Sequence, residues 1–146
     1  MQLSKTFLWT IVLIAFAGLA DAGYLTVTHL LQISPPCSLS GGCDVVTKSS
    51  YSEVFGIPVA LLGSLYYLTV LLLSILTIDT KHTKWIRLAL ILTPFGFFAS
   101  LYFVYLQLFV IDAICQYCMG SAVTSTLLFA FALTKKRLLF DQKTTS

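Results

Sequence analysis

The sequence predicts an all-α membrane protein in which one domain, residues 1–146, folds as a bundle of four transmembrane helices. Of its 146 residues, 58% are hydrophobic and only 10% are charged, whereas ordinary soluble domains are about 25% charged. The mean hydropathy is +0.90. A soluble domain of this size cannot bury so much apolar surface. A soluble enzyme and a disordered chain are therefore excluded, and the small, scattered net charge of +3 excludes a nucleic-acid partner.

Four apolar segments are long enough to cross a bilayer, which takes about 20 mostly apolar residues. Residues 56–78 carry no charged side chain. Residues 88–134 carry one charge, Asp112, and are too long for one helix, so we expect two helices joined near Asp112. The first segment continues past Asp21 and is interpreted as a retained span rather than a signal peptide. The predicted spans are 7–33, 56–78, 86–110 and 113–134, with an outer loop at 34–55.

Basic residues predict the orientation, because loops rich in Lys and Arg remain in the cytoplasm. Both termini and the 79–87 loop are predicted to be cytoplasmic, since they carry eight of the nine basic residues: Lys5, Lys81, Lys84, Arg87, Lys135, Lys136, Arg137 and Lys143. The 34–55 loop and the Asp112 turn then face outward, in a multi-pass protein of the plasma (inner) membrane. All four cysteines fall on the outer, periplasmic side, where disulfides persist.

Cys115 and Cys118 form a CxxC motif at the predicted start of the last helix. One helical turn brings these two positions onto one face. Asp112 is the expected N-cap, and the helix N-terminus stabilises a thiolate, most strongly on Cys115. The thiolate is the species that attacks a disulfide. The motif predicts redox chemistry, although zinc sites also use CxxC.

Cys37 and Cys43 flank the segment Ser-Leu-Ser-Gly-Gly, whose flexibility allows a disulfide to close and reopen. We interpret this pair as a relay that contacts two partners in turn, and the two pairs together as a system for thiol–disulfide exchange. Three alternatives remain open at this point. The cysteines could form structural disulfides in a non-enzymatic membrane module, they could bind zinc, or the protein could bind another metal. We expect no metal site.

A lipid-soluble quinone is the expected electron acceptor. The CxxC is followed by Met119 rather than by the His of a haem-attachment motif. The chain also lacks the glycine-rich motifs of nucleotide binding. A redox-active pair at membrane depth, among apolar helices, is compatible with a quinone dissolved in the bilayer.

The chain resembles the vitamin K epoxide reductase family over about residues 7–135. The resemblance is carried by Cys115-Gln116-Tyr117-Cys118 and by an earlier set: Cys43-Asp44-Val45-Val46, Ser49, Tyr51-Ser52, Phe55-Gly56-Ile57-Pro58 and Leu62-Gly63. The Cys-x5-Cys spacing looks like that of the prokaryotic branch, which oxidises thiols at the expense of quinone. The family implies a four-helix bundle around the quinone, with a short half-helix in the outer loop capping the pocket.

The resemblance also implies roles for the cysteines. Cys37 matches the loop cysteine that exchanges with a thioredoxin-fold partner, and Cys43 matches the one that attacks Cys115. Cys118 matches the cysteine beside the quinone, which is a ubiquinone, a menaquinone or a vitamin K-type quinone. Disulfide formation in exported proteins is the implied outcome. Since the chain ends at Ser146 without a fused thioredoxin-like domain, we expect the partner to be a separate protein.

The resemblance and helical spacing together predict the residues that contact the quinone. Ser49 matches the loop serine near the half-helix, and Tyr51 stands where many animal members have tryptophan. Val59 and Ala122 stand where animal members hydrogen-bond vitamin K through asparagine and tyrosine, which favours plain quinone reduction over epoxide reduction. The alternative is a vitamin K-type quinone or epoxide reductase that uses thiols as reductant. The predicted binding residues are Ser49, Tyr51, Phe55, Val59, Leu62, Tyr66 and Ala122.

Overall fold

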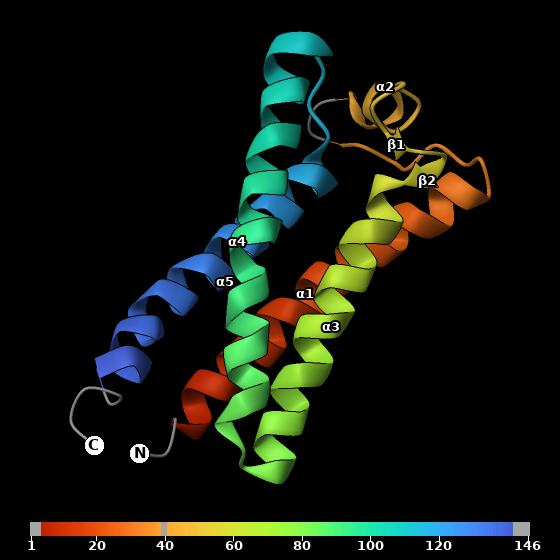
Figure 1. Cartoon of the computed structure of the whole chain (residues 1–146). Helices are drawn as coiled ribbons and strands as arrows, with labels where there is room; N and C mark the ends of the chain where they lie inside the picture. The colour runs from red at the N-terminus through yellow and green to blue at the C-terminus, as the bar shows by residue number, and fades with distance from the viewer. Residues whose placement is uncertain (1–3, 39–40, 142–146) are drawn as a thin grey trace.

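Four long helices form the body of the protein, which confirms the predicted all-α class (Figure 1). The computed structural model describes residues 4–38 and 41–141. Its long helices are α1 (Lys5–Leu30), α3 (Val59–Thr80), α4 (Thr83–Tyr105) and α5 (Gln116–Asp141). Each is long and apolar enough to cross a membrane. Helices α1 and α4 each pack against both α3 and α5, so the four close into a bundle.

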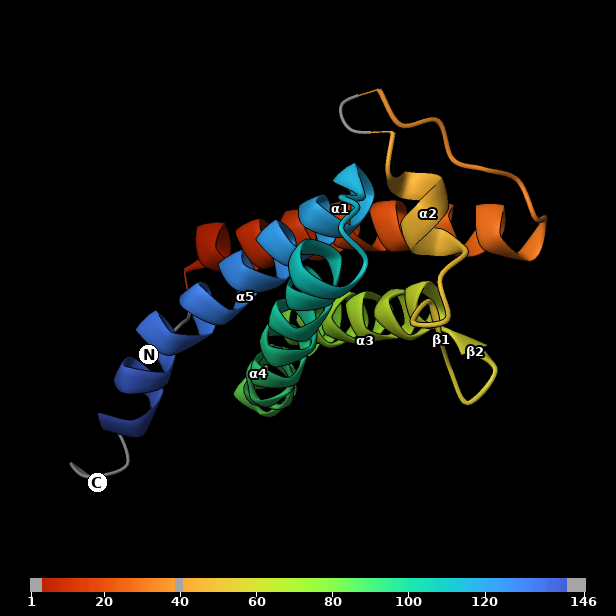
Figure 2. The same cartoon turned by 90° about the horizontal axis from the view of Figure 1, so that it is seen from above.

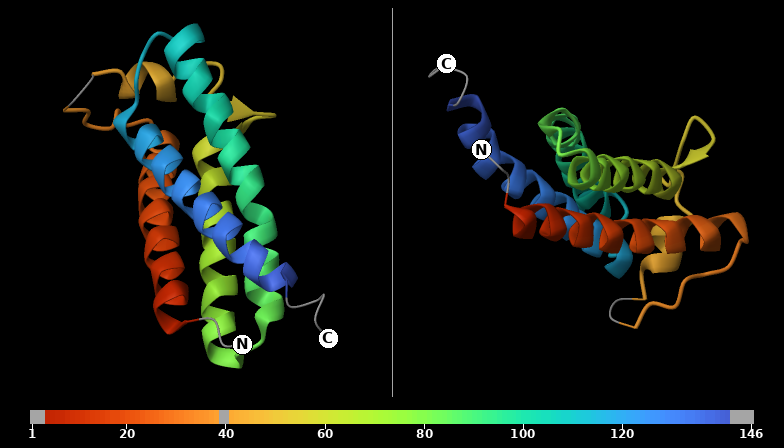
Figure 3. Two further views of the ribbon diagram at one scale, coloured as in Figure 1. Left: turned by 90° about the vertical axis from the view of Figure 1, so that its left-hand side faces the viewer. Right: turned by 90° about the horizontal axis from the view of Figure 1, so that it is seen from below.

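The two ends of the bundle differ. Both ends of the described chain and the α3–α4 connection lie at one end, and the short elements lie at the other (Figures 1 and 3). The short elements belong to residues 41–58, which we call the cap. The cap contains α2 (Cys43–Thr47) and the strands β1 (Glu53–Val54) and β2 (Ile57–Pro58). The implied half-helix is therefore present, and all four cysteines lie at the cap end.

A short β-hairpin, with two residues in each strand, completes the cap. It was not predicted. Strands β1 and β2 pair antiparallel, with Val54 opposite Ile57. Phe55 and Gly56 form the turn with φ values of 54° and 77°, the combination that a type I′ hairpin turn requires. Seen from the cap end, the hairpin projects beyond α3 (Figure 2).

The observed helix ends differ from the predicted ones by a few residues, and the prediction that Asp112 caps α5 was wrong. Asp112 adopts φ 53°, and α5 begins four residues later, at Gln116. The carbonyl of Cys115 accepts the first helical bond, from the N–H of Met119 (3.0 Å). Between the two helices, α4 continues into a π-helical turn, η1 (Leu106–Val110), and such turns are frequent at functional sites.

Tyr67 joins three helices in the middle of the bundle. Its ring lies so close to Gly18 of α1 that a Cβ atom on Gly18 would be 2.3 Å from a ring carbon. Its hydroxyl donates to the carbonyl of Ser121 on α5 (2.7 Å) and lies 2.8 Å from the Thr124 hydroxyl. Only 1% of the Tyr67 surface is exposed. Because small residues let membrane helices approach closely, the Gly18–Tyr67 contact sets the spacing of α1 and α3.

Replacement of Gly18 by Ala should therefore destabilise the bundle. The ring of Tyr67 is held by its hydroxyl and cannot move aside, so we expect a loss of about 1–3 kcal/mol, typical of overpacking. Gly23→Ala in the same helix is the matched control, because a Cβ atom there meets nothing within 4 Å. Thermal unfolding in detergent measures both, and an equal melting temperature for the two variants would contradict this packing.

Candidate functional site

Two cysteine pairs meet at the cap end of the bundle. Cys37 and Cys43 form a disulfide, whereas Cys115 and Cys118 are thiols outside any disulfide. Cys43 begins α2, and Cys115 directly precedes α5. Both of these cysteines are fully buried, with 0% exposure.

Direct backbone contact holds the two pairs together. A Cβ atom on Gly42 would lie 2.6 Å from the carbonyl oxygen and 2.8 Å from the nitrogen of Ile114. Gly42 and Ile114 directly precede Cys43 and Cys115. Gly42 has an ordinary φ of −88°, so the absence of a side chain, and not backbone freedom, is what this position requires.

A second contact joins the segments from the other side. Tyr117, inside the CxxC, donates a hydrogen bond from its hydroxyl to the carbonyl of Pro36 (2.9 Å). Pro36 directly precedes Cys37. Each cysteine of the loop disulfide thus follows a residue that contacts the 114–118 segment, so the loop disulfide is held against the CxxC motif.

Polar contacts tether α2 to the segment that follows α1. Ser34 donates to the carboxylate of Asp44 (2.5 Å), and Lys48 forms an ion pair with the same carboxylate (2.8 Å). Hydrogen bonds from Lys48 and Ser34 lower the pKa of Asp44, so the carboxylate stays ionised. Nearby, His29 at the end of α1 contacts Glu53 of β1 at 3.0 Å.

Gln107 positions the start of the CxxC and was missed by the sequence analysis. It lies in η1, is 2% exposed, and accepts a hydrogen bond on Oε1 from the backbone N–H of Cys115 (2.9 Å). Its own carbonyl accepts from the N–H of Ala113 (3.2 Å). The available signal was a single amide side chain within an apolar span, eight residues before Cys115.

The Cys115 thiol is acidified by its surroundings. A hydrogen bond from the Cys118 thiol lowers the pKa of Cys115 to about 7, with help from the backbone N–H groups of Cys118 and Tyr117. Burial and the nearby Asp21 carboxylate act against this effect. The stabilisation expected at a helix N-terminus is therefore present, although Asp112 does not supply the cap.

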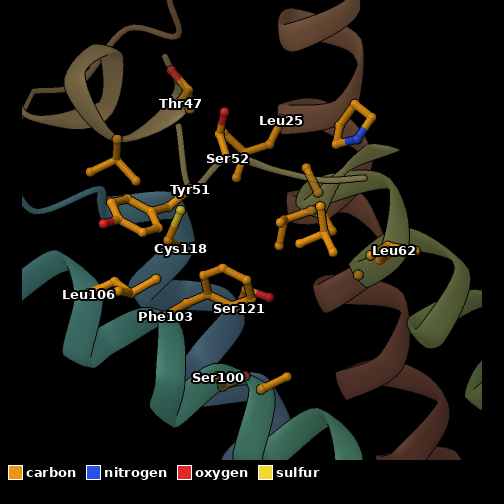
Figure 4. Close-up of a pocket in the computed structure, with 18 of the residues that line it drawn as sticks. Leu25, Thr47, Tyr51, Ser52, Leu62, Ser100, Phe103, Leu106, Cys118 and Ser121 are labelled. Atoms are coloured by element: carbon orange, nitrogen blue, oxygen red, sulfur yellow. The ribbon is translucent and has the colours of Figure 1, made fainter. Parts of the chain in front are cut away.

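An apolar cavity of about 370 Å³ lies beneath the cap, and Cys118 forms part of its wall, whereas Cys115 does not. Figure 4 shows Thr47 and Ser52 of the cap at one end of this cavity, Cys118 and Tyr51 below them, and Ser100 at the opposite end. The wall consists mostly of apolar side chains from α1, α3 and α4, with a smaller contribution from α5. The volume suits a small organic ligand.

Five of the seven residues predicted to contact quinone lie in this wall: Ser49, Tyr51, Val59, Leu62 and Tyr66. Phe55 and Ala122 lie outside it. Phe55 is 99% exposed, because the hairpin turn carries it away from the bundle. On α5 the wall is formed by Cys118, Ser121 and Ser125, spaced so that they share a helix face. That spacing from Cys118 could have identified both serines.

Gly42→Ala tests the backbone contact. We expect it to separate Cys43 from Cys115, because the added methyl group meets backbone atoms that cannot rotate away. In a Cys37→Ala/Cys118→Ala background, oxidation should join Cys43 to Cys115, and Gly42→Ala should slow this at least tenfold. Gly120→Ala is the control, since its Cβ atom would meet nothing closer than 3.8 Å. Peptide mass spectrometry follows the reaction, and equal rates in both variants would show that the contact does not set the geometry.

The acidity of Cys115 provides a pH test. With the loop disulfide intact, thiolate absorbance in the ultraviolet should rise with a midpoint near pH 7, the pKa of Cys115. Cys118→Ala removes the hydrogen bond that stabilises the thiolate, so the midpoint should rise toward the ordinary thiol value of about 8.5. Cys115→Ser supplies the blank. A midpoint that does not move in Cys118→Ala refutes the role given to that hydrogen bond.

Comparison with protein families agrees with this geometry. Residues 9–133 match the model of the vitamin K epoxide reductase family. The match runs from α1 to α5 and includes the cap and all four cysteines.

Proposed function

Because the chain belongs to the vitamin K epoxide reductase family, whose members are generally thiol and quinone oxidoreductases, we propose that it is a membrane thiol:quinone oxidoreductase that drives disulfide formation in exported proteins. One observation carries the proposal. The CxxC motif connects two environments, with Cys115 beside the segment of the loop disulfide and Cys118 in the wall of an apolar cavity.

The reaction begins with a reduced dithiol partner. One partner thiolate attacks Cys37, and the second partner thiol completes the exchange, so that the partner leaves as a disulfide and Cys37 and Cys43 become thiols. Cys37 is only half-buried and Ser38 beside it is exposed, which supports access from outside. A separate protein of the thioredoxin fold suits this role, because its own cysteines exchange by the same chemistry.

The electrons then pass to the CxxC motif in its disulfide form. The Cys43 thiolate attacks Cys115 and releases Cys118 as a thiolate. Cys37 next attacks Cys43, which restores the loop disulfide and releases Cys115. A leaving thiol of low pKa departs faster, and Cys115 has such a pKa. Gln107 holds the backbone of Cys115 during the exchange.

The quinone is the second substrate and binds in the cavity beside Cys118. The Cys115–Cys118 dithiol gives two electrons and two protons to the quinone, which leaves as quinol while the CxxC disulfide reforms. The apolar wall excludes water and suits the ring. The quinone enters the cavity from the bilayer, between the lipid-facing helices. The basic residues at the end of the bundle opposite the cap support an orientation with the cap on the periplasmic side.

Cys118→Ala should abolish quinone reduction. With a reduced thioredoxin-fold protein as donor and decylubiquinone as acceptor, we expect turnover to fall at least 1,000-fold, since neither the exchange nor the transfer to quinone can be completed. Quinone absorbance measures the rate in purified protein. Met119→Ala, the next residue along the chain, is the control and should keep most of the activity.

The same assay separates the alternatives. Normal turnover in Cys118→Ala, or no turnover in the native protein, would falsify the proposal. A non-enzymatic module with structural disulfides predicts no turnover and no mixed disulfide with any thiol protein. A metal-binding protein would instead be recognised by elemental analysis of the purified protein. If vitamin K epoxide is a better acceptor than quinone, the protein is an epoxide reductase that uses thiols as its reductant.

A further inference from the structure

We propose that the hydroxyl groups of Tyr66 and Ser125 hydrogen-bond the quinone carbonyl that lies farther from Cys118. This inference rests on the proposed function, because it assigns the polar anchor of the same cavity. Tyr66 lies on α3 and Ser125 lies on α5.

Both hydroxyl oxygens are buried without a hydrogen-bond partner. Among the described residues, only three buried side-chain polar atoms lack one: Asp21 Oδ2, Tyr66 Oη and Ser125 Oγ. Two of the three belong to residues of the cavity wall. The Tyr66 and Ser125 hydroxyls are neighbours and interact weakly, but neither has a partner in full hydrogen-bond geometry. Buried hydroxyls are normally satisfied, so this pair is suited to a ligand acceptor.

The distance from Cys118 to the pair suits a quinone ring together with its contacts at both ends. Ser125 lies seven residues after Cys118 on α5, which is two turns along the same face and a rise of about 10 Å. A ring that contacts the Cys118 sulfur at one edge, and accepts a hydrogen bond at its far carbonyl, spans a comparable length. Tyr66 approaches the same place from α3.

Several other hydroxyl groups of the cavity wall already have hydrogen-bond partners. Thr47, Ser49 and Ser52 of the cap donate to the backbone carbonyls of nearby residues. The hydroxyl of Ser121 lies 3.1 Å from that of Tyr67. Val59 and Ala122 have no polar side-chain atoms. Among the described residues of the wall, Tyr66 and Ser125 are the ones whose polar side-chain atoms are both buried and without a partner, so we assign them as donors to a carbonyl bound beyond Cys118.

The fold makes room for the Tyr66 ring in a specific way. A Cβ atom on Gly96 of α4 would lie 2.6 Å from the Tyr66 hydroxyl oxygen and 2.4 Å from the adjacent ring carbon. The glycine lets the phenol lie directly across α4. Tyr67, its neighbour, differs because its hydroxyl is held by Ser121 and Thr124.

Tyr66→Phe and Ser125→Ala, which each remove one hydroxyl group, test the assignment. Each should raise the KM for decylubiquinone and for menadione about fivefold, as expected for one lost hydrogen bond. Exchange between the loop disulfide and dithiothreitol should not change. Tyr67→Phe is the matched control: it removes a structural hydroxyl, so it should lower the melting temperature without a comparable change in KM.

An infrared measurement tests the same hydrogen bond without catalytic turnover. In the fully oxidised protein, which cannot reduce quinone, one carbonyl stretch of bound menadione with an isotopically labelled carbonyl should be shifted down by hydrogen bonding. The shift should be lost in the Tyr66→Phe/Ser125→Ala double variant and weakened in Gly96→Ala, which displaces the ring.

The outcomes separate the two proposals. If the native protein reduces quinone but the variants keep both the native KM and the shifted carbonyl band, the assignment of Tyr66 and Ser125 is wrong and the proposed function stands. If the native protein reduces no quinone and binds none, the proposed function fails and this inference fails with it.

Discussion

The contact between the backbones of Gly42 and Ile114 is the constraint on which the rest of the structure depends. These residues are 72 positions apart in the chain, but they approach so closely that there is no room for a side chain on Gly42. The contact places Cys43 and Cys115 in adjoining buried segments, so exchange between the pairs needs no large movement of the cap. The Tyr117–Pro36 hydrogen bond and the Ser34–Asp44–Lys48 group hold the cap in the same place from two further sides.

The start of α5 makes the two cysteines of the CxxC chemically different. Cys115 precedes the helix, where backbone N–H groups and the Cys118 thiol stabilise its thiolate. Cys118 lies one turn further on and reaches the apolar cavity. One cysteine is therefore suited to exchange with sulfur and the other to transfer toward a ligand. The π-helical turn that ends α4 places the Gln107 side chain where it accepts the hydrogen bond from the Cys115 N–H. A regular α-helical continuation would place this side chain elsewhere.

Much of this organisation could be predicted from the sequence, since it follows from strong local signals. The four spans follow from apolar length, and the half-helix from resemblance around Cys43. Five predicted contact residues lie in the cavity wall because they follow helical spacing or the cap motif. The features that were missed depend on backbone geometry that apolar patterning does not reveal. The close approach of Gly42 to Ile114 joins segments distant in the chain. The bond from Cys115 to Gln107 depends on the π-helical turn that precedes it, and the exposure of Phe55 depends on the local hairpin turn. The prediction of an N-cap at Asp112 was wrong because the turn gives Asp112 a positive φ, and the helix begins later in the chain.

A single-turnover experiment tests the central claim most directly. All four cysteines are first reduced, one equivalent of decylubiquinone is added, and rapid alkylation with peptide mass spectrometry then reads the redox state of each pair over time. The account predicts that the Cys115–Cys118 disulfide forms first and is then replaced by the Cys37–Cys43 disulfide, which leaves the pairing seen in the structure. A loop pair that stays reduced after quinone is consumed, or one that is oxidised before the CxxC, would contradict it.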